Sequence, residues 1–297
     1  MLGDNPFIGV SHLTQEKARE EAEEASLGNK VAVFEAAIRG GATGFVFSTH
    51  RSNLELLAHL KIHRRDLVNA MNYYVLLPYA QSYVRRANVE GTPRLLRSSL
   101  SNMMYSTLAT ADMLAALATL KPERLAGLLI RLELAPYLEV LPREKVKTVL
   151  LHEILTDPVA AFGLVDLLKF LVSYLRKRIG ISFGLHTKNF GVLYRHGFFN
   201  EILPEYIMTS INPLGYMMAP NKETVEEAIE DLGAKTKIIA INVLASGATS
   251  LDEATEYLSR FKDRIYAVSS ASSKPHRIHD NFQAIRLRLG KTTQIAR

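Results

Sequence analysis

The sequence contains no cysteine. A disulfide framework, a cysteine-based zinc site and a cysteine nucleophile are therefore excluded. The absence also fits a reducing compartment, so we expect a cytoplasmic protein. The amino-terminal residues Met1–Pro6 lack a basic region followed by an apolar run, and no signal peptide is expected.

Long apolar runs and basic blocks are also missing. The most apolar stretch, residues 159–175, is interrupted by Asp166 and Lys169, which indicates a buried helix and no membrane partner. Lysine and arginine are spread along the chain without interleaved aromatics, so nucleic acid is not an expected partner. The formal net charge of +6 leaves two interpretations, a mildly basic surface or a site for an anionic ligand such as a phosphate.

Short apolar runs alternate with helical patterns along the 297 residues. This alternation is typical of parallel βαβ units, and the length suits one (β/α)8 TIM barrel over residues 1–297. The expected strands are 7–11, 44–48, 67–74, 147–151, 180–185, 206–211, 237–244 and 264–269.

Several helices have readable ends. Asn29 is placed to cap a helix over 29–39, and a long helix is expected over 157–178. Ser250 and Glu253 have the spacing of a capping box. The spacing of apolar residues predicts further helices over 224–231 and 275–289.

The segment between the third and fourth strands is about twice as long as a normal crossover connection. Residues 75–146 have a helical pattern broken by prolines, which predicts a helical insertion. If it enters directly after the third strand, it lies over the carboxyl-end mouth, where barrel active sites are found. It would then serve as a lid or as an oligomer surface. Simple packing on the outer ring is the alternative.

The last third of the chain carries a family resemblance. The segments "SINPLGY", "IIAINVLASGATSLDEATEYL" and "AVSSASSKPHRIHDNFQAI" are similar to strands six to eight of the aldo-keto reductases. That family holds the adenosine 2′-phosphate and adenine of NADP with a Lys-Ser pair, an Arg and an Asn near its last helix. Ser272, Arg277 and Asn281 stand at matching spacing, with Ala271 in place of the lysine and Lys274 nearby. The resemblance therefore implies NADP as a cofactor.

The residues of this corner suit an anion without reference to any family. Serines, including Ser272 and Ser273, precede a helix whose first N–H groups attract negative charge. Arg277 adds a guanidinium fork suited to phosphate oxygens. A phosphorylated small molecule is therefore a second candidate ligand. In the alternative interpretation the serines only cap the helix and Arg277 is solvated.

The resemblance extends more weakly to "GGATGFVFSTH", "VLLHEILTDP" and "GISFGLHTKNF". The family's chemistry uses a tyrosine acid, a lysine, an aspartate and a histidine. Ser48 stands at the aspartate position and Asn72 at the lysine position, no tyrosine follows at the required spacing, and only His152 matches. Ile241 aligns with the residue that stacks on nicotinamide, so that packing is lost. Tyr73 and Tyr74 are the alternative acids, but neither has a lysine beside it, so ordinary carbonyl reduction is not expected.

Polar residues follow many of the expected strands. Four histidines from four strands, together with a carboxylate such as Glu153, form the kind of ligand set that zinc, iron or nickel uses. The same groups suit acid–base chemistry near neutral pH. No H-x-H or H-E-x-x-H motif is present, and a single histidine at a strand end is commonly structural. The candidate metal ligands are His12, His50, His152 and His186, and the candidate catalytic residues are His152, His50, His186 and Asn72.

Three functions remain open from sequence. The first is an aldo-keto-reductase-like barrel that binds NADP or a phosphorylated small molecule through Ser272, Ser273, Arg277 and Asn281, with chemistry at the histidines. The second is a metal-dependent hydrolase, lyase or isomerase built on the histidine cluster. The third is a barrel without catalysis, whose helical insertion serves partner binding or oligomerisation.

Overall fold

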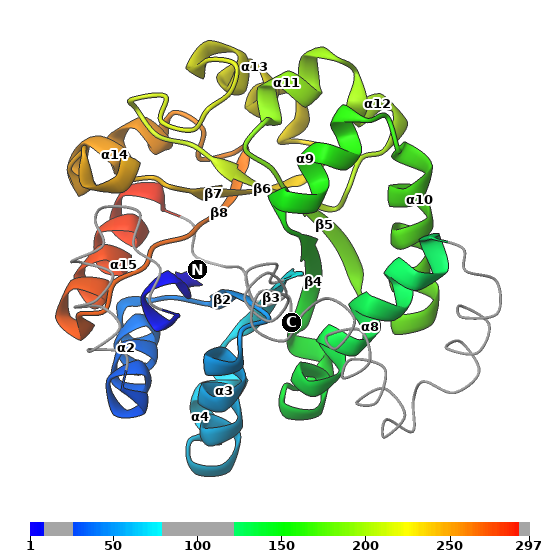
Figure 1. Ribbon diagram of the computed structural model, residues 1–297. Coiled ribbons are helices and arrows are strands. Elements are labelled where there is room, and N and C mark those ends of the chain that lie inside the picture. The colour runs from blue at the N-terminus through cyan, green and yellow to red at the C-terminus, as the bar shows by residue number, and fades with distance from the viewer. Residues whose placement is uncertain (9–25, 79–121, 291–297) are drawn as a thin grey trace, which may run out of the picture.

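A computed structural model describes residues 1–8, 26–78 and 122–290. Its eight strands are all parallel and pair in sequence order, forming a barrel with helices around it (Figure 1). A bridge between Leu2 and Ser270 joins the last strand to the first, with the Gly3 N–H donating to the Ser270 carbonyl at 3.0 Å. The strands are β1 (Leu2–Gly3), β2 (Gly44–Ser48), β3 (Asn72–Leu77), β4 (Val146–Leu151), β5 (Ser182–His186), β6 (Tyr206–Ser210), β7 (Lys237–Ile241) and β8 (Ile265–Val268).

The predicted (β/α)8 barrel is confirmed, but two predicted strands were wrong. The first was placed at 7–11, whereas β1 is Leu2–Gly3 and Phe7 belongs to the short 3-10 helix η1 (Asn5–Phe7); residues 9–11 lie outside the described part. The third was placed at 67–74, yet Arg65–Ala70 is a helix, α4. Short apolar runs do not distinguish a strand from a buried helix by periodicity, and Leu67 and Val68 are buried in helical form.

The helices form an outer ring around the sheet (Figure 1). They are α2 (Leu27–Gly40), α3 (Arg51–His63), α4, α8 (Pro122–Val140), α9 (Glu153–Ala161), α10 (Val165–Tyr174), α11 (Phe190–Arg195), α12 (Phe198–Glu201), α13 (Lys222–Leu232), α14 (Leu251–Ser259) and α15 (Pro275–Leu289), with shorter turns at η2 (Arg143–Lys145), η3 (Leu175–Ile179) and η4 (Ala245–Gly247). None of the helices within the described ranges is long and apolar enough to cross a membrane.

Helix ends show which local predictions held. The capping box of α14 and the bounds of α15 are confirmed. Asn29 is not the cap of α2, because Ser26 accepts the Asn29 N–H at 3.3 Å, while the Asn29 amide donates to the Ser273 carbonyl at 2.9 Å. The single helix expected over 157–178 is divided into α9 and α10 around Gly163, which has a φ of +67°.

The predicted insertion over 75–146 was too wide. Residues 75–77 complete β3 and residue 146 begins β4. Between them, α8 packs against α3 and α10 in the outer ring, so this part is the ordinary crossover helix. Residues 79–121, to which the prediction of a cover over the mouth applies, lie outside the described residues.

An apolar layer lies on each side of the sheet. The larger lies between the strands and the helices, and the smaller fills the barrel interior, with Tyr74, Leu150 and Tyr206 among its members. Gly184 of β5 is required here, because a Cβ atom would come within 2.5 Å of the Leu150 side chain. This filled interior is a packed core and no channel, so ligand access is confined to the mouth.

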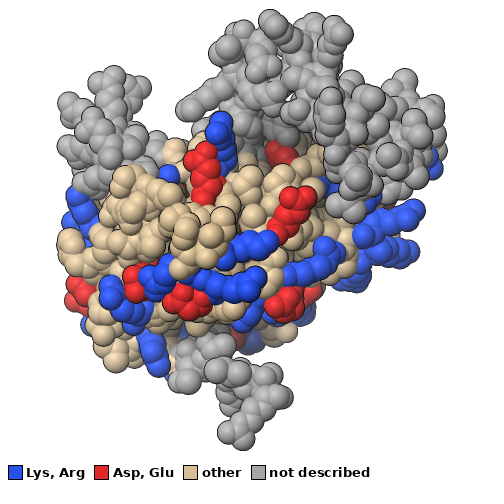
Figure 2. Space-filling model, turned by 90° about the horizontal axis from the view of Figure 1, so that it is seen from below, with Lys and Arg blue, Asp and Glu red and all other residues tan. Residues whose placement is uncertain are grey.

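Charges on the outer face alternate in sign. Lysine and arginine side chains form a broken band with acidic residues among them (Figure 2). Arg51 pairs with Glu55 at 2.8 Å and Arg64 pairs with Glu35 at 3.3 Å. Such ion pairs partly compensate the excess of positive charge on the described surface.

Candidate functional site

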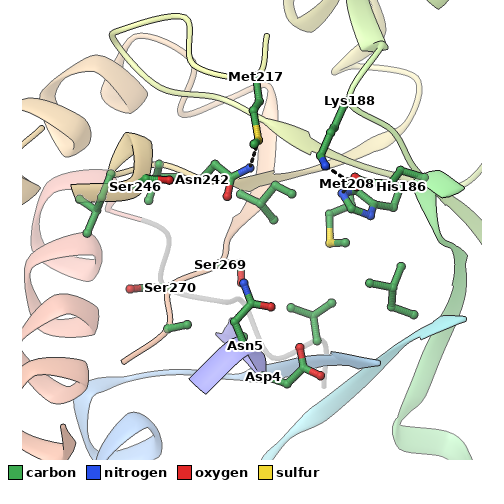
Figure 3. A pocket seen from close by; sticks show the side chains of 18 of the residues that line it. Asp4, Asn5, His186, Lys188, Met208, Met217, Asn242, Ser246, Ser269 and Ser270 are labelled. Atoms are coloured by element: carbon green, nitrogen blue, oxygen red, sulfur yellow. Dashed lines mark hydrogen bonds and ion pairs between the residues drawn. The ribbon is translucent and has the colours of Figure 1, made fainter. Parts of the chain in front are cut away.

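A cavity of about 350 Å³ opens at the carboxyl end of the barrel (Figure 3). Its polar lining comes from the residues after β1, from those at or after the ends of β4 and β5, and from those after β7 and β8. Apolar side chains of the strands, including Val46, Leu76 and Met208, line the space between them. A concave apolar pocket with a few convergent polar groups is the usual form of a small-molecule site.

His152 follows β4 and caps α9. Its Nδ1 accepts the Ile154 N–H at 3.2 Å, so the neutral ring carries its proton on Nε2. Burial is the main cause that lowers the pKa of His152, and the positive charge of Lys188 also lowers it, while Glu153 and Asp4 raise it. The first turn of α9 thus fixes one tautomer of a ring that lines the cavity.

His186 ends β5 and is 7% exposed. Its ring centroid lies 5.3 Å from that of His152, edge to face. Its Nε2 is 3.1 Å from Glu153 Oε2, but the contact lacks the alignment of a hydrogen bond, and neither ring nitrogen has a hydrogen-bond partner among the described residues. Burial first, then His152 and Lys188, bring the pKa of His186 well below its usual value. The ring is therefore neutral at pH 7.

Glu153 and Lys188 form an ion pair beside this ring. Lys188 Nζ contacts Glu153 Oε1 directly, and the side chains are 41% and 17% exposed respectively. The second carboxylate oxygen of Glu153 is the one that faces His186. The wall made by β4 and β5 therefore brings together two neutral imidazoles, a carboxylate and an ammonium group.

Asp4 follows β1 and faces the same cavity (Figure 3). Its Oδ2 accepts three hydrogen bonds, from the Ser48 N–H at 2.8 Å, the Ser48 hydroxyl at 2.6 Å and the Asn53 amide at 2.7 Å. Burial raises the pKa of Asp4, and these hydrogen bonds oppose the rise. Sequence reasoning missed this residue because it placed the first strand too late. Because β1 has only two residues, the sequence shows no periodicity that could have placed Asp4 at a strand end.

The structure separates the other predicted catalytic residues from this group. His50 caps α3, with Nδ1 accepting the Ser52 N–H at 3.2 Å, and it is not among the residues that line the cavity. Asn72 begins β3 and pairs with Gly44 at the start of β2. It therefore lies at the amino end of the barrel, opposite the mouth, and its predicted position at a strand's carboxyl end was wrong because the third strand was misplaced. Leu77 ends that strand instead.

The predicted metal ligands are only partly brought together. His152 and His186 are neighbours and His50 is apart from the cavity, while His12 lies outside the described residues. Within residues 1–8, 26–78 and 122–290, no group of three histidine, aspartate or glutamate side chains is placed to hold a metal ion.

Neither tyrosine of β3 can take the place of a catalytic acid at the mouth. The Tyr73 hydroxyl donates to the Val68 carbonyl at 2.8 Å, and the Tyr74 hydroxyl contacts that of Tyr266 at 3.1 Å. Burial raises the pKa of both phenols. By contrast, Ile241 at the end of β7 does line the cavity.

The corner before α15 is largely hydrogen-bonded within itself. Ser272 Oγ accepts the Lys274 N–H at 3.1 Å, and the buried Asn281 amide donates to Ser270 Oγ at 3.1 Å. Ser273 offers its carbonyl to Asn29, and Arg277 is exposed at the first turn of α15. The cavity reaches this corner through residues 269–271. The four residues predicted to bind the cofactor are not among those that line the cavity, namely Ser272, Ser273, Arg277 and Asn281.

The loop after β7 borders the cavity with an unusual backbone. Asn242, Ala245 and Ser246 have φ values of +53°, +46° and +58°, which residues other than glycine rarely adopt. Asn242 is held there by its amide, which donates to Ser210 Oγ at 2.8 Å. Such strained residues persist where the surroundings fix them, and they concentrate at functional sites.

No protein-family model matches the sequence, and no curated protein matches it. Solved structures resemble the fold. A candidate aldo-keto reductase from Pseudomonas aeruginosa aligns with a TM-score of 0.54 and 15% identity, covering 89% of this chain and 85% of that one. The holo form of an aldo-keto reductase from Bacillus halodurans aligns with a TM-score of 0.52 and 10% identity, covering 97% and 90%. The chain thus has the (β/α)8 barrel fold of the aldo-keto reductases, with a divergent sequence.

Proposed function

We propose that the chain is a small-molecule enzyme. It binds NADP or another phosphorylated ligand across the barrel mouth and performs acid–base chemistry at His152 and His186. The phosphate lies near Arg277 and the first turn of α15, and the reacting group lies in the cavity. The observation that carries the proposal is the cavity itself, because one opening reaches both the buried histidine pair and residues 269–271, which lead into α15.

The chemistry at the β4–β5 wall would be proton transfer. Two neutral imidazoles and a carboxylate are groups that accept or donate a proton near neutral pH. His152 presents its Nε2–H, because Nδ1 is engaged by α9. Glu153 contacts Lys188 through Oε1 and faces His186 with Oε2, so its carboxyl group lies beside the histidine pair. Barrel enzymes recruit catalytic groups from several strand ends in this way.

Carbonyl reduction by the usual tetrad is not part of the proposal. At the end of β2, Ser48 donates to Asp4 and supplies no carboxylate of its own. The end of β3 is apolar at Leu76 and Leu77. A bound NADP would have no lysine of β3 beside its reacting group. Its phosphate partner would be Arg277.

The test is a fluorescence titration with NADPH. The wild-type chain should show saturable binding, and Arg277→Ala should weaken it about tenfold, as expected for loss of one charge-assisted contact. Arg286→Ala is the matched control, since it removes the same charge from an exposed position farther along α15.

Absence of saturable NADPH binding would refute the nucleotide form of the proposal, and a titration with inorganic phosphate would then test the simpler phosphorylated ligand. Equal losses in Arg277→Ala and Arg286→Ala would point to unspecific attraction by the basic chain. Turnover found in a substrate screen should fall in His186→Asn if the histidine pair carries the chemistry.

A further inference from the structure

The charges that line the cavity do not cancel. Within residues 1–8, 26–78 and 122–290, the ionisable residues that line it are Asp4, Glu153, Lys188 and the two histidines. Lys188 compensates Glu153 through their ion pair, and burial keeps both imidazoles neutral by lowering their pKa values. Asp4 remains, and no described lysine or arginine forms an ion pair with it. Among the described residues, the lining therefore carries one carboxyl group without a cationic partner, and burial raises the pKa of that group.

The geometry of Asp4 leaves one oxygen for a ligand. All three hydrogen bonds from Ser48 and Asn53 reach Oδ2. None of these three hydrogen bonds reaches Oδ1, and the backbone N–H of Asp4 itself also interacts with the carboxylate and lowers its pKa. Figure 3 shows the carboxylate directed into the cavity. A carboxyl group that is 7% exposed and so firmly held is a preorganised acceptor.

The buried ring of His186 lines the same cavity as Asp4. Its two ring nitrogens are buried without hydrogen-bond partners among the described residues, which costs free energy unless something binds them. A neutral imidazole always has one acceptor nitrogen. His186 lines the cavity with its ring while both of its nitrogens are enclosed, so the acceptor that a donor group of a ligand would meet is Asp4.

We propose that the cavity binds the protonated amino group of a small organic amine, with Asp4 Oδ1 as its principal acceptor. The hydrocarbon part of the amine packs against Val46, Leu76 and Met208. This assignment rests on the proposed function because it uses the same cavity, and it names the class of ligand that binds there. The ammonium group brings three donors and the single positive charge that the lining lacks.

Other ligand groups fit this end of the cavity less well. A hydroxyl would donate to Asp4 but leave its charge uncompensated in a poorly solvated site. A carboxylate or phosphate would add a second negative charge beside Asp4, and like charges at short range are unfavourable there. Any anionic part of the ligand therefore belongs at the opposite end, toward residues 269–271 and α15.

The test compares three probes of similar shape, benzylamine, benzyl alcohol and benzoate, by isothermal titration calorimetry at pH 7 with the full chain. Wild-type protein should bind benzylamine about tenfold more tightly than benzyl alcohol, as expected for a hydrogen bond to a charged group, and benzoate most weakly. Asp4→Asn should abolish the preference for the amine. Asp166→Asn is the control, because it removes the same charge from a fully exposed side chain on α10.

Lys188→Met keeps the proposal testable if Asp4→Asn does not fold. It removes the cation that compensates Glu153, so benzylamine should bind more tightly and benzoate more weakly than in the wild type. Equal affinity for amine and alcohol, an unchanged preference in Asp4→Asn, or binding of no probe overturns the proposal. Arg277→Ala should leave benzylamine binding intact, so failure here is distinct from failure of NADPH binding at α15.

Discussion

Asp4 and His186 occupy the same cavity in opposite ways. Each is 7% exposed and each stands at the carboxyl end of a strand. Asp4 receives three hydrogen bonds that join the β1 end to β2 and α3. His186 receives none in the described chain, although Glu153 lies 3.1 Å away. One buried polar group is therefore built into the fold, and the other is held in place by packing alone.

The difference separates structural from functional burial. A buried polar group with saturated hydrogen bonds lowers the free energy of the fold, whereas an unpartnered one raises it. Natural chains keep few of the second kind, and those they keep concentrate at sites of function. Asp4 has both characters, since one oxygen supports the fold and the other faces the cavity. His186 has only the second.

The largest expected effect lies on the Asp4 side. Asp4→Ala leaves the Ser48 N–H, the Ser48 hydroxyl and the Asn53 amide without their common acceptor, and should lower the free energy of unfolding by about 2–4 kcal/mol. Asp4→Asn retains an acceptor oxygen and should cost about 1 kcal/mol. Urea unfolding followed by circular dichroism measures both. Equal stability of Asp4→Ala and the wild type would show that water replaces the carboxylate at no cost, and the structural role would be lost.

The pH dependence of stability should have opposite signs at the two residues. The pKa of His186 is lowered in the folded state, so below an unfolded value of about 6.5 the unfolded chain takes up a proton that the folded chain refuses. Stability is then lost as the pH falls, by up to about 1.4 kcal/mol per pH unit for one proton. The pKa of Asp4 is raised, so its contribution is complete at low pH and is lost as the pH rises above about 4.

Unfolding curves collected between pH 4 and pH 8 test both signs. His186→Leu should flatten the fall in stability on the acidic side of about pH 6.5, and His152, whose pKa is also lowered, should account for part of what remains. Asp4→Asn should remove the decline that sets in above about pH 4. An unchanged slope in His186→Leu would mean that the ring is protonated as easily in the folded state as in the unfolded one.

The sequence was sufficient to predict the histidines at the ends of β4 and β5, but it was not sufficient to predict Asp4 after β1. His152 and His186 were found because β4 and β5 are apolar runs of ordinary length, with clear ends and a polar residue after each. β1 has only two residues, too few to show periodicity. Asp4 therefore had no strand to be assigned to, and the barrel order alone reveals that it stands beside Ser48.

The wrong boundaries of the third strand explain the wrong placement of Asn72. Asn72 was expected at the mouth because the apolar residues of α4 and β3 were joined into one strand, which shifted its end by several residues. In a parallel barrel such a shift moves a residue from one end of the molecule to the other.

The hydrogen bonds of Ser272 and Asn281 in the corner before α15 depend on how α15 packs on the strands. The spacing of these residues in the sequence carries no information on that packing.

The smallest expected effect is at His186. Replacing it with leucine removes two unpartnered nitrogens and keeps the apolar contacts, so the free energy of unfolding at pH 8 should change by less than about 1 kcal/mol, in either direction. Asn281→Leu is the matched control, because that amide is 8% exposed and donates to Ser270; its loss should cost about 1–3 kcal/mol. If His186→Leu is instead the more damaging of the two, His186 has a partner in the folded chain that its contacts with the described residues do not include. The contrast between a fixed carboxylate and a free imidazole would then no longer distinguish structure from function in this cavity.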